Sequence, residues 1–568
     1  MHRMFDVRRF LTAIFVGIFA VVGSIVAIDA PANAVTGDAS TVDYALSFNG
    51  TTDYLEATEG TQYASRAVYT VEAWAKPSSV TCATGSLCTI ASHDGDWWIG
   101  IKDSKFQYLV YQAGQGSNTG YVDSGVTAIA NAWAHVTLVR NDTALSFYVN
   151  GSLAKTSTLT SGRSTYSGYP IKVGAHYGNF FSGQIDELKI WSAVRDATAI
   201  ASDMHNYQSN ASSTSGLLAY FDFNEGGTNS TVNNRVGVGA NLVFVNASPV
   251  ISYVDVKTTT IRTGKTVVTF PRSYLTPSGG WTVPIGITRL NVLVVAGGGA
   301  GGSGGDSTGA GGGGAGGLIE TTQDLSSASV AKITVGQGGI GDRSSYWLDG
   351  FSGQNSKFGD ALTAIGGGGG GGRQSASGKA GGSGGGVSGR VNAATAGGAG
   401  TTGQGYKGGD GRTAAVGVAS GSGGGGAASA GSSTAAGGAG GNAVTSAITN
   451  SSYSAGGAGG VWNSNAVAAN GSPNTGNGGG GSGGSYVQAN GFWGSGGSGG
   501  SGIVVIAYAP VDDKALTTGT SNYASATGQI FPASADYSME LWVKPDSIPA
   551  NHKPIIATPN DLTFGTRF

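Results

Sequence analysis

The chain has 568 residues, a formal net charge of −2 and only 11% charged residues. This length exceeds what one compact core can organise and predicts about three modules. Because no basic excess is present to neutralise phosphates, we do not expect nucleic-acid binding. Glycine is the outlier, with 103 residues, but it shows neither the strict three-residue period nor the proline content of collagen.

The first 34 residues have the pattern of an export signal. Three arginines within the first nine residues precede an uncharged apolar run over 10–28, and Ala32-Asn33-Ala34 supplies the small-x-small pattern that a signal peptidase needs. The apolar run is long for a signal peptide, so an uncleaved membrane anchor is the alternative. Both alternatives place the rest of the chain outside the cytoplasm. No later hydrophobic stretch is long enough to span a bilayer, so the sequence predicts a secreted or cell-surface protein.

The zone over 43–250 predicts an all-β fold. Apolar residues alternate with polar or small ones over 71–75, 106–110, 134–139 and 145–149, and Asn150-Gly151 then gives a strong signal for a tight hairpin. Alternation buries one face of each strand, so a series of such strands pairs two sheets face to face. We therefore expect an antiparallel β-sandwich with at most one short helix, near 196–205.

Two cysteines, Cys82 and Cys88, flank a short loop that contains glycine. In an oxidising compartment such a pair forms a disulfide bond, which is the favoured interpretation. The alternative is a two-cysteine metal site, for which His93 and Asp94 are the nearest further ligands in the sequence.

Five sequence blocks lie along this zone, at 45–55, 69–77, 133–151, 181–191 and 217–226. The most specific of them is FSGQIDELKIW at 181–191. In their order these blocks resemble the LamG-like, pentraxin-related jelly rolls of the concanavalin A-like type. The resemblance implies a jelly-roll β-sandwich and says much less about the ligand, because one fold hosts many functions.

Calcium is the one cofactor that the resemblance implies. Modules of this kind often hold it through loop oxygens at the sandwich edge, and calcium accepts flexible shells of carboxylates and carbonyls. Four aspartates stand at or near family positions where acidic residues recur: Asp43, Asp53, Asp186 and Asp222. A role in a turn or at the surface explains each of them equally well.

Aromatic side chains in or beside loops are the candidate ligand-binding residues, because exposed rings provide platforms for sugar rings. These residues are Trp97, Trp98, Tyr177, Phe180 and Phe181. Packing in the core is the alternative for each of them. Trp74 and Trp191 lie inside strand patterns, and for these two we expect core packing.

Catalysis is not expected. Jelly-roll glycanases carry the spacing Glu-x-Asp-x-x-Glu on one strand, and no segment of the chain fits it. Asp186 and Glu187 are adjacent, so in a regular strand they point to opposite faces and cannot act as an acid/base pair. No histidine pair has the spacing of zinc ligands on a helix. We therefore predict a protein without enzymatic activity.

Glycine dominates the zone over 265–510, which apolar strands at 290–296 and 503–508 bracket. The zone resembles glycine-rich domains of bacterial surface proteins and of some phage tail adhesins, in which glycine runs pack as polyglycine-II helices. Glycine has no Cβ, so neighbouring backbones can approach closely enough to hydrogen-bond. A flexible spacer is the alternative. Aromatic residues at intervals argue against disorder throughout: Trp347, Tyr453, Trp462 and Trp493.

Residues 537–545 repeat the pattern of 69–77, so we expect an incomplete second jelly roll over 513–568. A segment of this length cannot close a sandwich and would leave strand edges exposed. The repeat therefore predicts that the chain is a fragment of a longer modular protein.

Together these features predict a surface-displayed adhesion or recognition protein whose jelly roll binds a glycan or a surface protein. We expect no nucleic-acid partner and no membrane span after removal of the signal. Two alternatives stay open. One is a purely structural protein of the envelope or matrix, and the other is a non-catalytic accessory part of a longer extracellular hydrolase.

Overall fold

The computed structural model describes most of residues 43–509, together with 553–557 and 563–566. Between 43 and 509 it leaves out 58–65, 83–86, 114–117, 163–168, 209, 226–230, 246–251, 263, 276–278, 285–286, 306–307, 326–329, 342–347, 374–376, 390–394, 412–418, 435, 463, 465–467 and 484–493. The expected export signal over 1–34 lies outside the described residues. So does the expected second jelly roll, apart from β31 (Lys553–Ala557) and β32 (Thr563–Thr566), which pair antiparallel.

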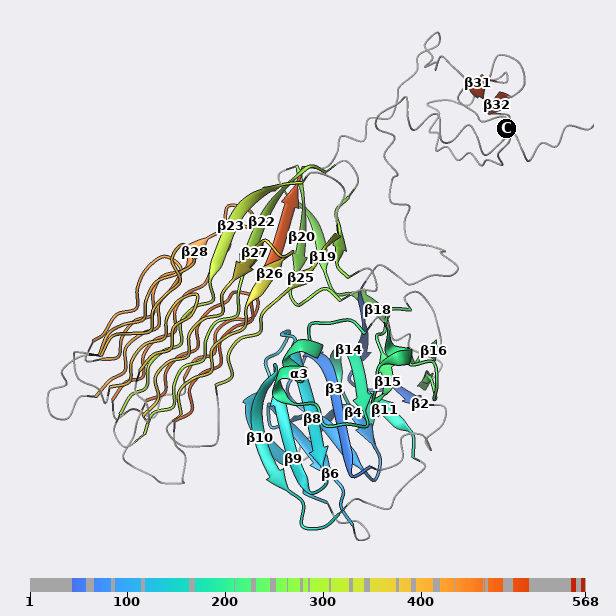
Figure 1. Ribbon diagram of the computed structural model, residues 1–568, viewed down its shortest axis with the longest axis horizontal. Coiled ribbons are helices and arrows are strands. Elements are labelled where there is room, and N and C mark those ends of the chain that lie inside the picture. Colours follow the sequence, from blue (N-terminus) through green and yellow to red (C-terminus); the bar gives the residue numbers. More distant parts are fainter. Residues whose placement is uncertain are drawn as a thin grey trace, which may run out of the picture. The chain divides into compact units, whose positions relative to one another are not determined.

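The chain divides into two compact units, Ala30–Val511 and a second one made of Met1–Asp29 with Asp512–Phe568. The first unit begins with a sandwich of two large sheets (Figure 1). One sheet is built from β1 (Tyr44–Asn49), β3 (Val68–Pro77), β8 (Ala134–Asn141), β9 (Ala144–Val149), β10 (Ser152–Thr158), β14 (Ser182–Trp191), β15 (Leu217–Phe221) and β18 (Ser252–Asp255). Their order is β10-β9-β8-β3-β14-β1-β18, and β15 pairs with β14. The first sheet thus extends past residue 250.

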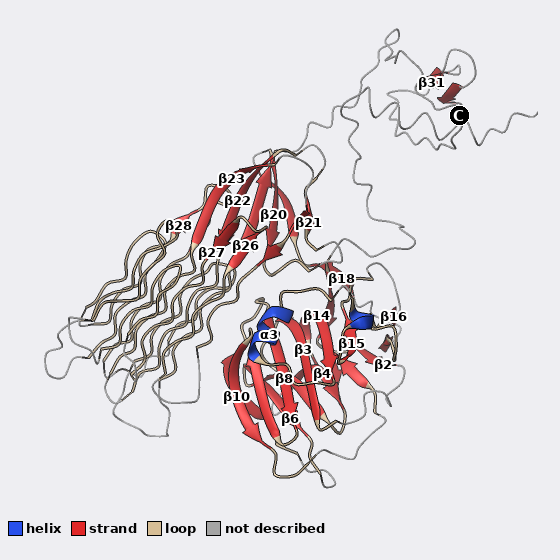
Figure 2. Cartoon of the chain, viewed as in Figure 1, coloured by secondary structure: helices blue, strands red, loops and turns tan. Residues whose placement is uncertain are grey.

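The second sheet consists of β2 (Tyr54–Ala57), β4 (Cys88–His93), β5 (Trp97–Lys102), β6 (Lys105–Val110), β7 (Val122–Thr127), β11 (Ile171–Val173), β16 (Thr231–Val232) and β17 (Leu242–Val245). Their order is β16-β17-β2-β11-β4-β5-β6-β7. A small hairpin, β12 (Ala175–His176) and β13 (Asn179–Phe180), follows β11. Helix in the described part of this sandwich is confined to α3 (Ala197–Asp203) and the 3-10 turn η2 (Ala211–Ser213) (Figure 2).

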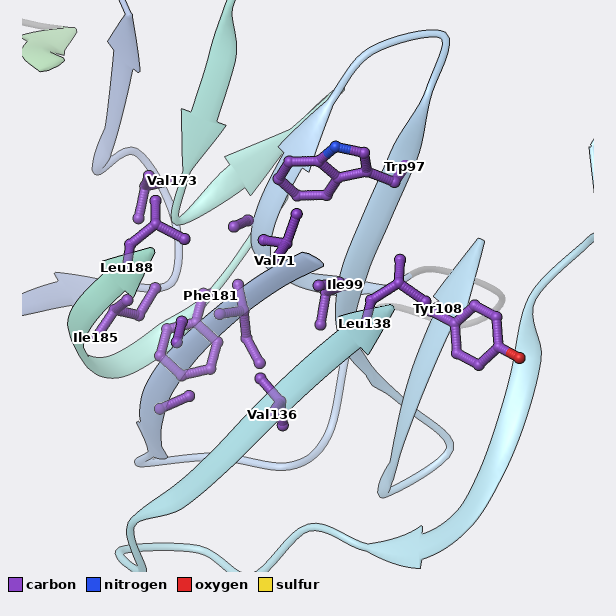
Figure 3. Packing of buried hydrophobic residues seen from close by; sticks show 14 of the residues in the cluster. Val71, Trp97, Ile99, Tyr108, Val136, Leu138, Val173, Phe181, Ile185 and Leu188 are labelled. Carbon is purple, nitrogen blue, oxygen red and sulfur yellow. The ribbon is translucent and has the colours of Figure 1, made fainter. Parts of the chain in front are cut away.

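The inner faces of the two sheets form the core of the sandwich. Val71, Val136 and Leu138 from the first sheet meet Ile99 and Tyr108 from the second (Figure 3). Such alternate burial is what strands with a period of two produce when two sheets pack face to face. The predicted all-β jelly-roll sandwich is confirmed.

Two further features of the sandwich were expected, a disulfide bond and two buried tryptophans. Cys82 and Cys88 form a disulfide bond, which confirms the favoured pairing. Trp74 and Trp191 are buried, with 0% and 1% of their surface exposed. Among the described residues, no helix has the length and apolar character that a membrane crossing requires.

The glycine-rich half, residues 256–509, contains a third large sheet, which is apolar. It is formed by β19 (Thr258–Arg262), β20 (Lys265–Phe270), β22 (Arg289–Val295), β23 (Leu318–Asp324) and β30 (Ile503–Tyr508), in the order β19-β20-β30-β22-β23. Three smaller sheets accompany it among the described residues. In two of them, β21 (Trp281–Thr282) pairs with β24 (Val330–Ala331), and β28 (Val444–Thr445) pairs with β29 (Ser452–Tyr453). The other has the order β25 (Ile333–Thr334), β26 (Ser356–Phe358), β27 (Leu362–Ala364). Trp347 and Trp493 lie outside the described residues.

Extended glycine segments run side by side from this sheet (Figure 1), and the backbone hydrogen bonds of 297–303 repeat every third residue. The N–H groups form three series. In the first, Gly297, Ala300 and Ser303 donate to the carbonyl oxygens of Gln354, Phe351 and Leu348. In the second, Gly298 and Gly301 donate to Gly500 and Gly497, and in the third, Gly299 and Gly302 donate to Gly314 and Gly311. Three residues per turn without internal hydrogen bonds is the geometry of a polyglycine-II helix. A Cβ added to Gly301 would lie 1.9 Å from the carbonyl oxygen of Gly480. The described segments therefore confirm polyglycine-II-like packing rather than a flexible spacer.

Candidate functional site

The outer face of the second sheet carries aromatic side chains. Successive residues of a strand point to opposite faces, so in β5 Trp97 faces the core and Trp98 faces outward. Trp97 lies among the core residues (Figure 3), and Phe181 is buried in the same core. Their burial supports the alternative of core packing for these two residues, because the register of the backbone turns both rings into the sandwich.

Trp98 is the centre of a group of rings on this outer face, which we call the Trp98 cluster. Its members are Trp98, Tyr111, Tyr121, His176 and Tyr177. The centroid of the Trp98 ring lies 4.0 Å from that of His176, 6.2 Å from those of Tyr111 and Tyr177, and 6.3 Å from that of Tyr121. The second sheet supplies Trp98, while the β12–β13 hairpin supplies His176 and Tyr177. Sheet and hairpin thus build the cluster together.

Tyr177 stands at the tip of the β12–β13 hairpin and is the most exposed ring of the cluster. His176 pairs with Asn179, so Tyr177 and Gly178 form a two-residue turn. Both have positive φ, 44° and 77°, as a type I′ turn requires. Asparagine, aspartate or glycine usually fills such positions, and a bulky residue there is strained. Tyr177 nevertheless keeps this conformation with 73% of its surface exposed.

Asp94 fixes the position of the exposed ring. The Tyr177 hydroxyl donates a hydrogen bond of 2.7 Å to Oδ2 of Asp94, and Nε2 of His176 lies 3.5 Å from Oδ1. Partial burial acts to raise the pKa of Asp94, but the hydrogen bonds from His176 and Tyr177 outweigh it and lower this pKa below its ordinary value. The bond to Asp94 is also the main reason why the pKa of Tyr177 rises to about 12. The site therefore presents a carboxylate and a neutral phenol at neutral pH.

Three buried ring nitrogens of the cluster have no hydrogen-bond partner by geometry among the described residues. They are Nε1 of Trp98 and both ring nitrogens of His176, in residues that are only 8% and 2% exposed. Nε2 of His176 lies 3.5 Å from Oδ1 of Asp94. An unsatisfied buried polar group costs about 1–3 kcal/mol. Such groups call for an explanation, and a ligand that supplies the missing partners is one.

Phe180 is half-buried and packs against Tyr54 of β2, with 6.3 Å between the ring centroids. It therefore shares the hairpin with Tyr177, but its ring contacts a neighbouring strand rather than Trp98. Its predicted role in ligand binding stays a prediction.

The four aspartates considered as calcium ligands each contact groups of the chain. Asp186 contacts Nη2 of Arg272, and Oδ2 of Asp43 lies 3.7 Å from the same nitrogen. Oδ1 of Asp222 accepts a hydrogen bond of 2.7 Å from Arg235, and Asp53 accepts one of 2.8 Å from the side chain of Asn49. Among the described residues, no group of three or more His, Cys, Asp and Glu side chains is placed to hold a metal ion. Calcium binding by these aspartates stays a prediction.

Asp186 and Glu187 depart from the expected geometry of a regular strand. The pairing of β14 with β3 shifts register between Asp186 and Lys189, and φ of Glu187 is 53°. Ile185 and Leu188 both belong to the inner core, so the two acidic residues between them face outward together. The expectation that they point to opposite faces is wrong because a β-bulge interrupts the alternation. Both are fully buried and engaged, Asp186 with Arg272 and Glu187 with the Tyr220 hydroxyl.

Sequence reasoning pointed to Trp98 and Tyr177 but not to the roles of Asp94 and His176. Asp94 lies 83 positions from Tyr177, and no local pattern links the two. The only signals in the sequence were that His176 precedes Tyr177 and that Asp94 lies three residues before the pair Trp97 and Trp98.

Comparison with protein families finds two matches. Residues 49–201 match the concanavalin A-like lectin/glucanases superfamily, and residues 276–509 match a glycine-rich domain. No curated protein matches the sequence significantly.

Several solved structures resemble part of the chain. One is a candidate carbohydrate-binding protein from Bacteroides ovatus, with 18% identity over 38% of this chain and 60% of that one, at a TM-score of 0.30. The chain thus spans less than two thirds of that protein. Others are a heptameric SAP-like pentraxin from Limulus polyphemus (18% identity, 30% and 82% coverage, TM-score 0.24) and the CBM40 of a Ruminococcus gnavus IT-sialidase bound to sialyllactose (10% identity, 29% and 98% coverage, TM-score 0.23). With the sandwich described above, the family matches show that the chain carries a domain of the concanavalin A-like lectin/glucanases superfamily at residues 49–201, followed by a glycine-rich domain at residues 276–509.

Proposed function

We propose that the jelly roll is a carbohydrate-binding module and that the Trp98 cluster with Asp94 is its binding site. The observation that carries this proposal is Tyr177, which holds a strained conformation with an exposed ring. Strained backbone persists only where the surrounding structure enforces it, and such residues concentrate at functional sites. The lectin-containing superfamily of the domain supports the same function.

The chemistry of the site suits a sugar. The Tyr177 ring offers an apolar face for the C–H groups of a pyranose, and its edge stays fixed by Asp94. The Asp94 carboxylate can accept hydrogen bonds from sugar hydroxyls, and bonds to a charged acceptor are stronger than neutral ones. Nε1 of Trp98 and Nδ1 of His176 would gain partners from the ligand. A few polar groups around aromatic rings is the usual composition of a small-molecule site.

The proposal assigns the protein to recognition or adhesion, without catalysis and outside the cytoplasm. The Cys82–Cys88 disulfide supports an extracytoplasmic location, because such bonds persist in oxidising compartments. The pairing of Asp186 with Arg272 and of Glu187 with Tyr220 leaves neither carboxylate facing solvent, which supports a domain without an acid/base pair at that position.

Binding of the full chain to a panel of immobilised oligosaccharides tests this function. We expect Tyr177→Ala and Asp94→Asn each to weaken binding of the best ligand at least about tenfold, as removal of a central contact residue does. Tyr406→Ala is the matched control, because Tyr406 is also an exposed tyrosine, at 52%, but lies in the glycine-rich half. Binding that survives Tyr177→Ala, or binding to no sugar at all, contradicts the proposal.

A further inference from the structure

The outer face of the first sheet has its own apolar partner. One hydrophobic core contains Trp74 and Trp133 of the jelly roll together with Phe270, Trp281 and Leu290 of the glycine-rich half. Trp74 lies in β3 opposite Asp186 of β14 and His135 of β8, on the face away from the inner core. Residues from both halves of the unit Ala30–Val511 therefore bury this face.

Arg272, in the segment that follows β20, lies at the centre of this buried region with 1% of its surface exposed. Its Nη2 contacts Oδ2 of Asp186 and lies 3.7 Å from Oδ2 of Asp43. Its guanidinium carbon is 4.6 Å from the ring centroid of Trp133 and 5.6 Å from that of Trp74. Two carboxyl groups and two indole rings thus surround one cation.

We propose that Asp43, Asp186, Trp74 and Trp133 form a cation cage in the jelly roll whose ligand is the guanidinium of Arg272. The glycine-rich half supplies this cation, so the jelly roll and the glycine-rich half fold as one cooperative unit. At Asp43 and Asp186 the internal guanidinium takes the place of the calcium ion that the family resemblance implies.

The composition of the cage favours a guanidinium over calcium. Calcium takes six to eight oxygen ligands, whereas tryptophan faces attract organic cations, arginine in particular. Oδ2 of Asp43 also accepts a hydrogen bond of 2.9 Å from the backbone N–H of Leu275, three residues after Arg272. One carboxylate therefore holds both the side chain and the backbone of the inserted segment.

A second set of polar contacts lies beside the cage. Nδ1 of His205 hydrogen-bonds with Ser273 at 2.8 Å, and its Nε2 with Gln354 at 3.2 Å. Gln354 also donates a hydrogen bond of 2.6 Å to the carbonyl oxygen of Asn150. Buried polar groups with specific partners fix one geometry of association, because misplacement leaves them unpaired. The cage and these contacts therefore select one way of joining the two halves.

Removal of the cation alone should strongly destabilise the folded state, whereas removal of the cation together with both carboxyl groups should destabilise it much less. Burial is the largest influence on the pKa of Asp43 and raises it to about 8, while Arg272 acts in the opposite direction. Without Arg272 the two carboxyl groups lose the charge that offsets their burial. Breaking one partner of a buried ionic group is strongly destabilising, whereas replacing the whole group by neutral residues is often tolerated.

A mutant cycle on the full chain tests the cage through thermal unfolding. We expect Arg272→Met and the pair Asp43→Asn with Asp186→Asn each to lower the melting temperature by about 5 °C or more. Combining all three changes should restore most of the loss. The proposal is overturned if the melting temperature of the combined variant falls by the sum of the two separate losses. If Arg272→Met does not fold, recovery of folded protein in the combined variant supports the cage, and failure to recover contradicts it.

Arg289→Met is the control for the cycle. Arg289 pairs with Asp324 at 3.1 Å, but both side chains are exposed, at 70% and 74%. Exposed ion pairs contribute little, so this variant should keep the melting temperature of the wild type.

Chemical rescue identifies the cation that the cage accepts. Millimolar methylguanidinium should raise the melting temperature of Arg272→Ala and leave that of the wild type without a rise, since only the variant has an empty cage. Calcium chloride at the same concentration should give no rise in the variant. A rise with calcium alone, or with neither cation, contradicts the assignment of a guanidinium cage.

Discussion

Tyr177 and Trp98 show how single residues acquire a binding role from their backbone. Tyr177 is exposed because a two-residue turn with positive φ at both positions lifts it away from the sheet. Trp98 reaches the outer face only because it is the second residue of β5, while its neighbour Trp97 faces the core. The two tryptophans are chemically identical, so their roles follow from the alternation of the strand.

Glu72 is a single residue whose titration makes the stability of the fold depend on pH. Burial is the largest influence on its pKa and raises it to about 7, with Lys189, Trp191 and Arg195 opposing and Asp203 adding to the rise. Nε2 of His135, on β8, lies 3.4 Å from its Oε2. Because the pKa in the folded state is raised, its stabilising contribution is fully present below pH 4.5 and is lost as the pH rises through 7.

Glu72→Gln should therefore lose less stability than the wild type between pH 4.5 and 7. The slope of its unfolding free energy against pH should lack the contribution of about one proton. Glutamine keeps an acceptor for the indole N–H of Trp191, which donates a hydrogen bond of 2.8 Å to Oε1 of Glu72. Urea unfolding at several pH values measures the slope. An unchanged slope in the variant would show that another group titrates in this range.

At the scale of elements, the bulge in β14 and the glycine segments change what simple periodicity predicts. The bulge turns Glu187 to the outer face beside Asp186, where Glu187 accepts a hydrogen bond from the Tyr220 hydroxyl. The described residues 297–303 lie outside any strand, yet their hydrogen bonds repeat every third residue. Both features depend on backbone geometry that side-chain patterns do not encode.

Gly384 tests the packing of the glycine segments. A Cβ added there would lie 1.7 Å from the carbonyl oxygen of Gly398, so Gly384→Ala forces two backbones apart. We expect a loss of about 1–3 kcal/mol, the usual cost of overpacking. Gly480→Ala is the matched control, because its nearest atom would be 3.2 Å away. Calorimetry of both variants measures the difference, and equal stability of the two would contradict close packing around Gly384.

At the scale of the whole molecule, the two outer faces of the sandwich differ, because the shared core covers only one of them. Trp74 and Trp133 on the outer face of the first sheet pack in one core with Phe270 and Trp281. The outer face of the second sheet keeps an exposed ring, Tyr177. Ligand binding is therefore proposed for the second sheet, while the first sheet joins the jelly roll to the glycine-rich half.

The shared core predicts a single unfolding transition for residues 43–509. Calorimetry should give one peak for this part of the chain, and near-ultraviolet circular dichroism, which reports on the buried tryptophans, should follow it at the same temperature. The physical reason is that unfolding of either half alone would expose the core that the two halves share. Two separate transitions for these residues would show that the halves fold independently.

The sequence by itself determined the jelly-roll class and the Cys82–Cys88 bond, because alternation and cysteine spacing are local properties. It also singled out Trp98 and Tyr177. Only the tertiary structure brought Asp94 to Tyr177, turned Trp97 into the core and placed Arg272 beside Asp186, 86 positions away in the chain. These outcomes depend on sheet register and the docking of two halves, which arise from long-range pairing that no local pattern specifies.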